Sequence, residues 1–394
     1  MRKIFIILLM LLMFTKNIYA NGSIKEPNVE AQGAVLIDEL TGRILWEKNA
    51  HTQMSMASTT KIMTAIIALE RGNMDDTVTV SKKSQASPKV KMNLTNGEQI
   101  KLEYLMYALM LQSYNDAAVA IAEHVGGSIE EFCNIMTEKA KEIGAYNTSF
   151  KTPSGLDADG HYSTPYDMAI IARYALQNKD FIKITNRRDI SVSSNKRSYS
   201  LVNKNRLLNQ MHGAKGVKTG FTGKAGHCFV GAVERDEISL ISVVLGSGWG
   251  NNRNQKWIHT KEILDYGFLA FSYKNIVDEN DNAKSVLVGR SREKEVDIAF
   301  RNGLNLPLSE EEYNNIHIEI VSPNLVNAPI IKGQEIGLAK VYINNKLENE
   351  IALISVKDVA RHDLKTSIEK VLNAWFNLAG KGDIILPEFK PRVV

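Results

Sequence analysis

The sequence predicts an α+β fold in which an antiparallel sheet is flanked by helices, followed by a small β-sandwich-like domain and a C-terminal amphipathic helix. Between residues 33 and 271 a strand pair is followed by a block of helices, then by a strand meander and one more helix. Strands and helices that are grouped in this way, instead of alternating, are typical of α+β domains. After residue 275 short strand-like runs replace the helical patterns, which indicates a second, β-rich domain.

The first part of this pattern is a hairpin followed by helices. β-prone runs at 34–37 and 43–46 flank the polar turn 38–42 and predict two paired strands. Helices are then expected where apolar residues recur every three or four positions and where caps or glycines mark the ends. These helices cover about 58–72, 102–111, 116–125, 128–144 and 164–176, with Ser128 and Glu131 as a capping box and Thr164 and Pro165 opening the last one.

The next segment is rich in strand signals. Runs at 190–193 and 199–202 predict a strand pair. Three further runs, joined by short turns, predict an antiparallel meander; they cover 216–222, 226–233 and 239–245. A helix over about 254–271 completes this domain, for which we expect the bounds 21–275.

The second domain is expected over residues 276–357, and an amphipathic helix and tail over 358–394. The strand candidates are 285–289, 295–300, 315–321, 335–343 and 350–356. The large apolar side chains of the last helix, about 358–379, fall within an arc of roughly 160° at 100° per residue. The wide apolar face favours contact with a membrane surface, whereas the mixed charges of the polar face fit a helix that packs on the β-rich domain.

The first twenty residues have the pattern of a secretory signal peptide. Arg2 and Lys3 precede an apolar run at 4–14, and the small residue Ala20 marks a cleavage site. The run is too short to span a bilayer comfortably, although an uncleaved N-terminal anchor is the alternative. We therefore expect export across the cytoplasmic membrane and an extracytoplasmic location.

Charge and cysteine content narrow the range of partners. The chain has 48 Lys and Arg residues and 44 Asp and Glu residues, but three of the basic residues lie within 1–20, so the remainder is nearly neutral. This gives no electrostatic case for nucleic acid. Cys133 and Cys228 are expected to be buried thiols, although an exported protein could pair them. Cys and His residues show no metal-ligand spacing, so no metal or other cofactor is predicted.

Ser58 and Lys61 are candidates for a nucleophile and its base. They stand three residues apart at the head of an apolar helical run, so they share one helix face. A lysine whose pKa is lowered by burial and nearby cations can take the proton of a serine hydroxyl. The ordinary alternative is a serine that only caps the helix.

Two further motifs strengthen the catalytic interpretation. Ser113-Tyr114-Asn115 lies between two predicted helices, and Lys218-Thr219-Gly220 begins a predicted strand. With Ser58 and Lys61, they resemble the Ser-x-x-Lys, Ser-Asp-Asn and Lys-Thr-Gly signature of penicillin-binding proteins and class A β-lactamases. Three motifs in this order, each in its expected context, are far more specific than any one of them.

Residues 21 to about 275 resemble more narrowly the low-molecular-mass penicillin-binding proteins, which are serine D-alanyl-D-alanine carboxypeptidases. The segments 154–157 and 203–208 and the order of the domains carry this resemblance, which covers nearly the whole mature chain. It implies a fold like that of β-lactamases and transpeptidases. It also implies an enzyme that removes the terminal D-alanine from peptidoglycan pentapeptide stems through an acyl-enzyme on Ser58, and that β-lactams inhibit covalently.

The resemblance also implies a role for each motif residue. The catalytic residues would be Ser58, Lys61 and Ser113, with Ser113 relaying a proton to the leaving amine. Substrate binding would use Asn115, Lys218, Thr219, Gly220 and Phe221. In this scheme Lys218 keeps Lys61 deprotonated and attracts the terminal carboxylate that Thr219 binds. The oxyanion hole would be formed by the backbone N–H groups of Ser58 and Phe221. Arg253 is a further candidate near the site, with a surface ion pair as the alternative.

The implied partners are peptidoglycan stem peptides, β-lactam antibiotics and, through the C-terminal helix, the outer face of the cytoplasmic membrane. Three other functions compete with the carboxypeptidase. An endopeptidase that cuts peptidoglycan crosslinks would use the same residues. A β-lactamase of class A needs a glutamate to activate water, and the candidate loop 152–167 contains none. A non-catalytic penicillin-binding sensor would be expected to have lost motif residues.

Overall fold

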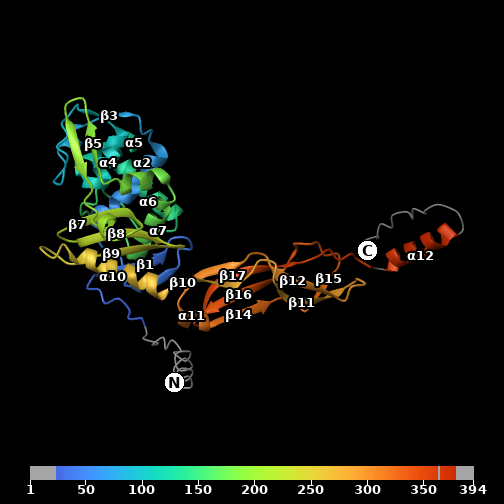
Figure 1. Cartoon of the computed structure of the whole chain (residues 1–394). Coiled ribbons are helices and arrows are strands. Elements are labelled where there is room, and N and C mark those ends of the chain that lie inside the picture. Colours follow the sequence, from blue (N-terminus) through green and yellow to red (C-terminus); the bar gives the residue numbers. More distant parts are fainter. Residues whose placement is uncertain (1–23, 363, 379–394) are drawn as a thin grey trace, which may run out of the picture. The chain divides into compact units, whose positions relative to one another are not determined.

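A computed structural model describes residues 24–362 and 364–378, and these fall into two compact units that divide between Ala270 and Phe271. Figure 1 shows helices and a sheet in the first unit and mainly strands in the second. The division stands close to the expected boundary at residue 275, because the segment that follows it forms a strand of the second unit. The predicted signal peptide at 1–20 and the tail at 379–394 lie outside the described residues.

The first unit is built on a five-stranded antiparallel sheet with the order β2-β1-β9-β8-β7. The predicted hairpin and meander are both confirmed. Their bounds are β1 (Gly33–Asp38), β2 (Ile44–Lys48), β7 (Ala214–Thr222), β8 (Gly226–Arg235) and β9 (Ile238–Leu245). The two ends of the unit meet in this sheet, since β1 pairs with β9 along its whole length.

Helices cover both faces of the sheet. Figure 1 shows α10 (Gln255–Ala270) on one side and the helical block on the other. That block comprises η1 (Ala57–Thr60), α2 (Lys61–Arg71), α3 (Lys82–Gln85), α4 (Leu102–Tyr107), η2 (Ala108–Gln112), α5 (Asn115–Gly126), α6 (Ile129–Glu142), α7 (Pro165–Leu176), α8 (Lys179–Asn186) and α9 (Leu207–Gln210). One buried apolar cluster joins α2, α4, α5, α6 and α7 to the sheet.

The helix caps follow the sequence signals. The Thr164 side chain accepts a hydrogen bond from the backbone N–H of Asp167, with Pro165 at the first helical position, and Ser128 accepts one from the N–H of Glu131. The predicted helix at 102–111 ends differently, because its last turn is a π-helix, η2, closed by Ser113 in the left-handed conformation (φ 66°). After this turn, α5 packs against α2.

Both cysteines are buried free thiols, as expected. Cys133 lies on α6 and Cys228 on β8. Burial raises the pKa of Cys133 to about 11 and that of Cys228 to about 12. Both thiols are therefore protonated at neutral pH and unreactive.

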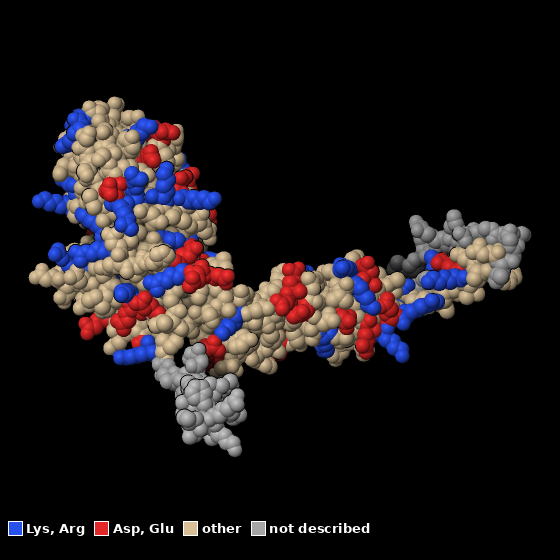
Figure 2. Space-filling view, in the orientation of Figure 1, with Lys and Arg blue, Asp and Glu red and all other residues tan. Residues whose placement is uncertain are grey.

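The second unit is a β-rich domain. A six-stranded sheet has the order β14-β16-β17-β12-β11-β15, and a separate pair joins β10 (Ser272–Val277) to β13 (Leu304–Leu308). The other elements are β11 (Asn282–Gly289), β12 (Glu295–Phe300), α11 (Glu310–Asn314), β14 (Ile316–Val321), β15 (Leu325–Asn327), β16 (Glu335–Ile343) and β17 (Lys346–Ser355). Figure 2 shows acidic and basic side chains interspersed on the visible face of this unit.

The C-terminal helix, α12 (Leu364–Leu378), presents apolar side chains to solvent. The exposed ones are Leu364, Ile368, Val371 and Trp375. Among residues 24–362 and 364–378, no helix is both long and apolar enough to span a bilayer.

Short strands and an unforeseen polar network shape the remaining part of the first unit. The pairs β3 (Thr77–Thr79) with β4 (Gln99–Lys101) and β5 (Asp189–Ser193) with β6 (Ser198–Val202) frame the loop 80–98. The predicted pair at 190–193 and 199–202 is confirmed, whereas β3 and β4 were not predicted. Their three residues each are too few for an alternating pattern to stand out.

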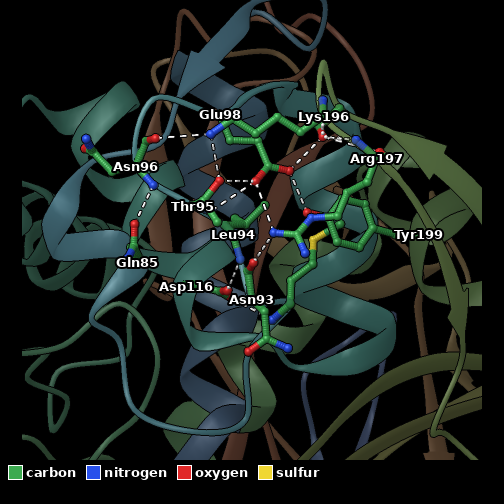
Figure 3. A network of polar contacts seen from close by, with 12 residues as sticks. Gln85, Asn93, Leu94, Thr95, Asn96, Glu98, Asp116, Lys196, Arg197 and Tyr199 are labelled. Atoms are coloured by element: carbon green, nitrogen blue, oxygen red, sulfur yellow. Dashed lines mark hydrogen bonds and ion pairs between the residues drawn. The ribbon is translucent and has the colours of Figure 1, made fainter.

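The carboxylate of Glu98 is the centre of this network (Figure 3). It is inaccessible to solvent and accepts hydrogen bonds from the Tyr199 hydroxyl (2.5 Å), the Ser194 hydroxyl (2.6 Å) and both the N–H and the hydroxyl of Thr95. The Arg197 guanidinium lies 3.5 Å away. Burial by itself raises the pKa of Glu98, but the hydrogen bonds from Ser194, Tyr199 and Thr95 outweigh it and lower the pKa to about 2. The ionised carboxylate thus ties the loop 80–98 to the β5–β6 hairpin.

We predict that Glu98→Gln lowers the free energy of unfolding at pH 7 by about 2 kcal/mol, because hydrogen bonds to a charged acceptor are lost. The folded pKa lies below the ordinary value of 4.5, so this contribution is present above pH 4.5 and is lost as the pH falls toward 2. Urea unfolding at pH 7 and pH 3 checks both points. The exposed Glu237→Gln is the control. An equal loss of stability on acidification in wild type and Glu98→Gln would contradict the assignment.

Candidate active site

Ser58 and Lys61 meet at the junction of η1 and α2. Their spacing places both side chains on one face, and Lys61 Nζ lies 3.0 Å from Ser58 Oγ. Ser58 is half-buried, whereas Lys61 is completely buried. The predicted pairing of these two side chains is therefore present in the fold.

Two carbonyl oxygens hold the Lys61 amine. Nζ lies 2.9 Å from Asn115 Oδ1 and 2.5 Å from the Ser154 carbonyl oxygen. The Asn115 amide nitrogen donates to the carbonyls of Pro88 and Lys89, which turns its oxygen toward Lys61. Carbonyl oxygens only accept hydrogen bonds. A neutral amine can satisfy both with its two N–H groups, which leaves its lone pair to accept the proton of Ser58.

The surroundings favour that neutral amine. Burial lowers the pKa of Lys61 well below its ordinary value, the nearby Lys218 ammonium lowers it further, and the Asp116 carboxylate opposes both effects. Lys218 is itself buried on β7, where its Nζ donates to the Thr219 carbonyl at 3.0 Å. Burial lowers the pKa of Lys218 to about 7, with Lys204 and Lys256 contributing.

The β7 strand approaches the Ser58 turn because residue 220 is glycine. A Cβ atom at Gly220 would lie 2.9 Å from the Ser58 nitrogen, a separation that real Cβ atoms essentially never show. The next residue, Phe221, is 48% exposed, and its ring stacks on His227 with centroids 4.4 Å apart. The backbone of β7 thus forms one wall beside Ser58, while the Phe221 side chain faces outward.

Most of the predicted residues line one cleft of about 310 Å³. Those that line it are Ser58, Ser113, Asn115, Thr219, Gly220 and Phe221. Lys61 and Lys218 lie behind this lining. Lys61 contacts Ser58 and Asn115, and Lys218 contacts Thr219. The structure therefore brings together all eight predicted site residues. Arg253 also lines the cleft, together with Lys204 and Lys256.

Sequence reasoning missed the backbone at Ser154, which contacts both central side chains. Its carbonyl oxygen accepts from Lys61 and lies 3.3 Å from Ser58 Oγ. Gly155 makes this possible, since its φ is +83° and a Cβ atom there would lie 1.9 Å from the Ala57 carbonyl oxygen. The Ser-Gly pair inside a polar loop was the only signal in the sequence.

Asp116 was missed as well. Its buried carboxylate accepts hydrogen bonds from the N–H groups of Met92 and Leu94, so it fixes the segment that continues into the cleft wall at Lys89 and Val90. These partners lie more than twenty residues earlier in the chain, so no local pattern shows the contact.

His161 has a structural position beside the active site. Its Nδ1 accepts from the N–H of Lys151 at 3.0 Å, and its Nε2 lies 3.0 Å from the Thr60 hydroxyl. Burial lowers the pKa of His161 to about 4, so the ring is neutral. It joins the loop 152–167 to the turn that carries Ser58.

The amino-acid sequence is similar to those of known proteins along most of its length. Residues 20–248 match the D-alanyl-D-alanine carboxypeptidase family, and residues 271–361 match the penicillin-binding protein 5 C-terminal domain. The chain is 32% identical over 377 residues to the D-alanyl-D-alanine carboxypeptidase DacF of Bacillus subtilis, covering 93% of this chain and 96% of that protein. It is 29% identical to DacC of Escherichia coli, over 86% of this chain and 87% of that protein.

Solved structures agree with this similarity. Penicillin-binding protein 5 from Haemophilus influenzae superposes with a TM-score of 0.71 at 28% identity, covering 86% of this chain and 99% of that structure. DacD from Francisella tularensis gives a TM-score of 0.70 at 25% identity, over 87% and 99%.

Proposed function

The chain belongs to the D-alanyl-D-alanine carboxypeptidase family, and we propose that Ser58 is the nucleophile on which its acyl-enzyme forms. The protein is a serine carboxypeptidase that acts on peptidoglycan stem peptides ending in D-alanyl-D-alanine, and β-lactams bind it. The observation that carries the assignment of Ser58 is the 3.0 Å contact between its hydroxyl and a buried amine.

Acylation begins with proton transfer from Ser58 to Lys61. The neutral Lys61 amine takes the hydroxyl proton as Ser58 Oγ attacks the carbonyl carbon between the two D-alanines. Collapse of the tetrahedral intermediate breaks the peptide bond and leaves the acyl group on Ser58. The departing amine receives a proton through Ser113, and water then releases the shortened peptide and restores the hydroxyl.

The remaining residues bind substrate and stabilise charge. Thr219 hydrogen-bonds the terminal carboxylate, and Lys218 attracts it. Asn115 holds both the peptide and Lys61. The backbone N–H groups of Ser58 and Phe221 form the oxyanion hole, which the close approach at Gly220 supports. Removing one such donor costs on the order of 10²–10³ in rate in other serine hydrolases.

We further propose that the protein is exported and lies on the outer face of the cytoplasmic membrane. The apolar run at 4–14, which follows Arg2 and Lys3 directly, supports export. The exposed apolar side chains of α12, among them Val371 and Trp375, support membrane contact. A helix of this kind lies in the interface plane with its apolar face among the lipid headgroups.

The nucleophile is tested with Ser58→Ala. We expect this variant to release no D-alanine from a pentapeptide ending in D-alanyl-D-alanine and to form no covalent adduct with benzylpenicillin, since the attacking oxygen is gone. Mass spectrometry of peptide and protein measures both. Ser193→Ala, an exposed serine on β5, is the control and should retain both activities. Labelling of Ser58→Ala by penicillin would refute the assignment.

We predict that Lys218→Gln shifts the acidic limb of penicillin acylation to higher pH. The Lys218 ammonium lowers the pKa of Lys61, so its removal raises that pKa, and the neutral amine then appears only at higher pH. The measurement is the pH dependence of the acylation rate constant. The shift separates this effect from the lower overall rate that loss of substrate attraction would cause. An unchanged acidic limb would show that Lys218 does not set the protonation of Lys61.

Membrane contact is tested by removing α12. Truncation after His362 keeps Val359, whose backbone pairs with Ile330, and we expect it to abolish co-sedimentation with vesicles of phosphatidylglycerol and phosphatidylethanolamine. In the full chain, Val371→Asp should weaken binding, because it places a charge on the apolar face. Asn377→Ser changes an exposed, uncharged side chain outside the exposed apolar set and serves as control. Undiminished vesicle binding by the truncated protein would exclude α12 as the attachment site.

A further inference from the structure

A second pocket, of about 340 Å³, adjoins the active-site cleft. Its lining includes Lys204, Arg206, Thr219, Arg253, Lys256 and Trp257, and we call it the basic pocket. It shares Lys204, Thr219, Arg253 and Lys256 with the cleft, so the two cavities lie side by side. Arg206 lines the basic pocket but not the active-site cleft.

Within residues 24–362 and 364–378, no carboxylate pairs directly with the cations of the basic pocket, which are Lys204, Arg206, Arg253 and Lys256. The guanidinium of Arg206 donates to the neutral amide oxygen of Asn254 at 3.1 Å. Four cations around one pocket repel one another, so an anion that enters gains attraction from all of them.

One of the cations that line the basic pocket, Lys256, is nearly buried. Lys256 is only 8% exposed, and its Nζ lies 5.3 Å from the centre of the Trp257 ring. Burial lowers the pKa of Lys256 to about 8, with Arg206 and Arg253 contributing. A buried ammonium without a carboxylate partner is costly for a folded protein. This cost is offset when a ligand supplies the missing negative charge.

The position of the basic pocket identifies the part of the substrate that reaches it. Ser58 lines only the cleft, whereas Thr219 lines both cavities. In the proposed function Thr219 binds the terminal carboxylate of the leaving residue. The pocket therefore lies beyond the scissile bond, on the leaving side, where the side chain of the last residue would extend.

We propose that the basic pocket is a subsite for a second acidic group on the leaving residue. This inference rests on the proposed function, and it adds a substrate class: peptides whose C-terminal D-residue carries a second carboxylate. The main carboxylate binds Thr219 and is attracted by Lys218 behind it, and the second is bound by Arg206 and Arg253, since guanidinium groups bind carboxylates with paired hydrogen bonds. The reaction is still hydrolysis: peptide and water give the shortened peptide and a free D-amino diacid.

An isosteric pair of peptides tests the subsite. Pentapeptides ending in D-alanyl-D-glutamate and D-alanyl-D-glutamine have nearly the same shape and the same terminal carboxylate, and they differ in the second charge. We expect wild-type kcat/KM to be about fivefold higher for the D-glutamate peptide. Arg206→Gln should bring this ratio close to one, and Arg206→Lys should give an intermediate ratio, because it keeps the charge but loses the paired hydrogen bonds. Arg188→Gln removes an exposed arginine outside both pockets and should leave the ratio unchanged.

Ionic strength and binding provide independent readouts. The preference should shrink as salt rises, because an exposed charge interaction is screened. Calorimetric titration of both peptides into Ser58→Ala should show tighter binding of the D-glutamate peptide, lost when Arg206→Gln is added, and this arm needs no turnover. Failure of wild type to cleave D-alanyl-D-alanine would contradict the proposed function only. Equal kcat/KM and equal binding for the two test peptides, or a preference that survives Arg206→Gln, would overturn the subsite.

Discussion

The buried amine of Lys61 is the interaction on which the catalytic unit depends. An amine withdrawn from water, with no carboxylate in contact among the described residues, is more stable in its neutral form. The carbonyl oxygens of Asn115 and Ser154 can accept its two N–H groups, and the lone pair then faces Ser58. Segments distant in the sequence must therefore meet around one nitrogen atom. Lys218 reinforces the effect, because two cations close together in a poorly polarisable interior destabilise each other's charged form.

Holding those segments together requires contacts of two kinds. Close backbone approach is the first, and it needs the glycines at 155 and 220, since a side chain at either place would collide with the turn that carries Ser58. Polar anchoring is the second. The buried carboxylate of Asp116 binds the loop 80–98, and that of Glu98 ties the end of this loop to the β5–β6 hairpin; the loop includes the cleft wall at Lys89 and Val90. A loop keeps one conformation only when its buried backbone polar groups find partners.

Charge is distributed unevenly over a nearly neutral chain. Positive side chains concentrate where the proposed function places the carboxylate end of the substrate, around Thr219 and continuing to Arg206. The second unit shows acidic and basic groups interspersed (Figure 2). A local field of this kind attracts anionic substrate without giving the whole protein a strong net charge. In the proposed function, substrate recognition belongs to the catalytic unit and membrane contact to α12, which is separate from that unit in sequence.

Local patterns were enough to predict the α+β class, the three motifs and the main helices and sheet strands of the first unit, because periodicity and short spacings are properties that a linear sequence carries. It also placed Ser58 beside Lys61, since one helical turn separates them. Packing between distant segments, by contrast, pairs β1 with β9, brings the backbone carbonyl of Ser154 to the amine and places Arg206 in a pocket next to the site. These features arise between residues far apart in the chain. A carbonyl oxygen is present in every residue, so its use as a ligand leaves no mark in the sequence, and a pKa depends on burial that only packing creates.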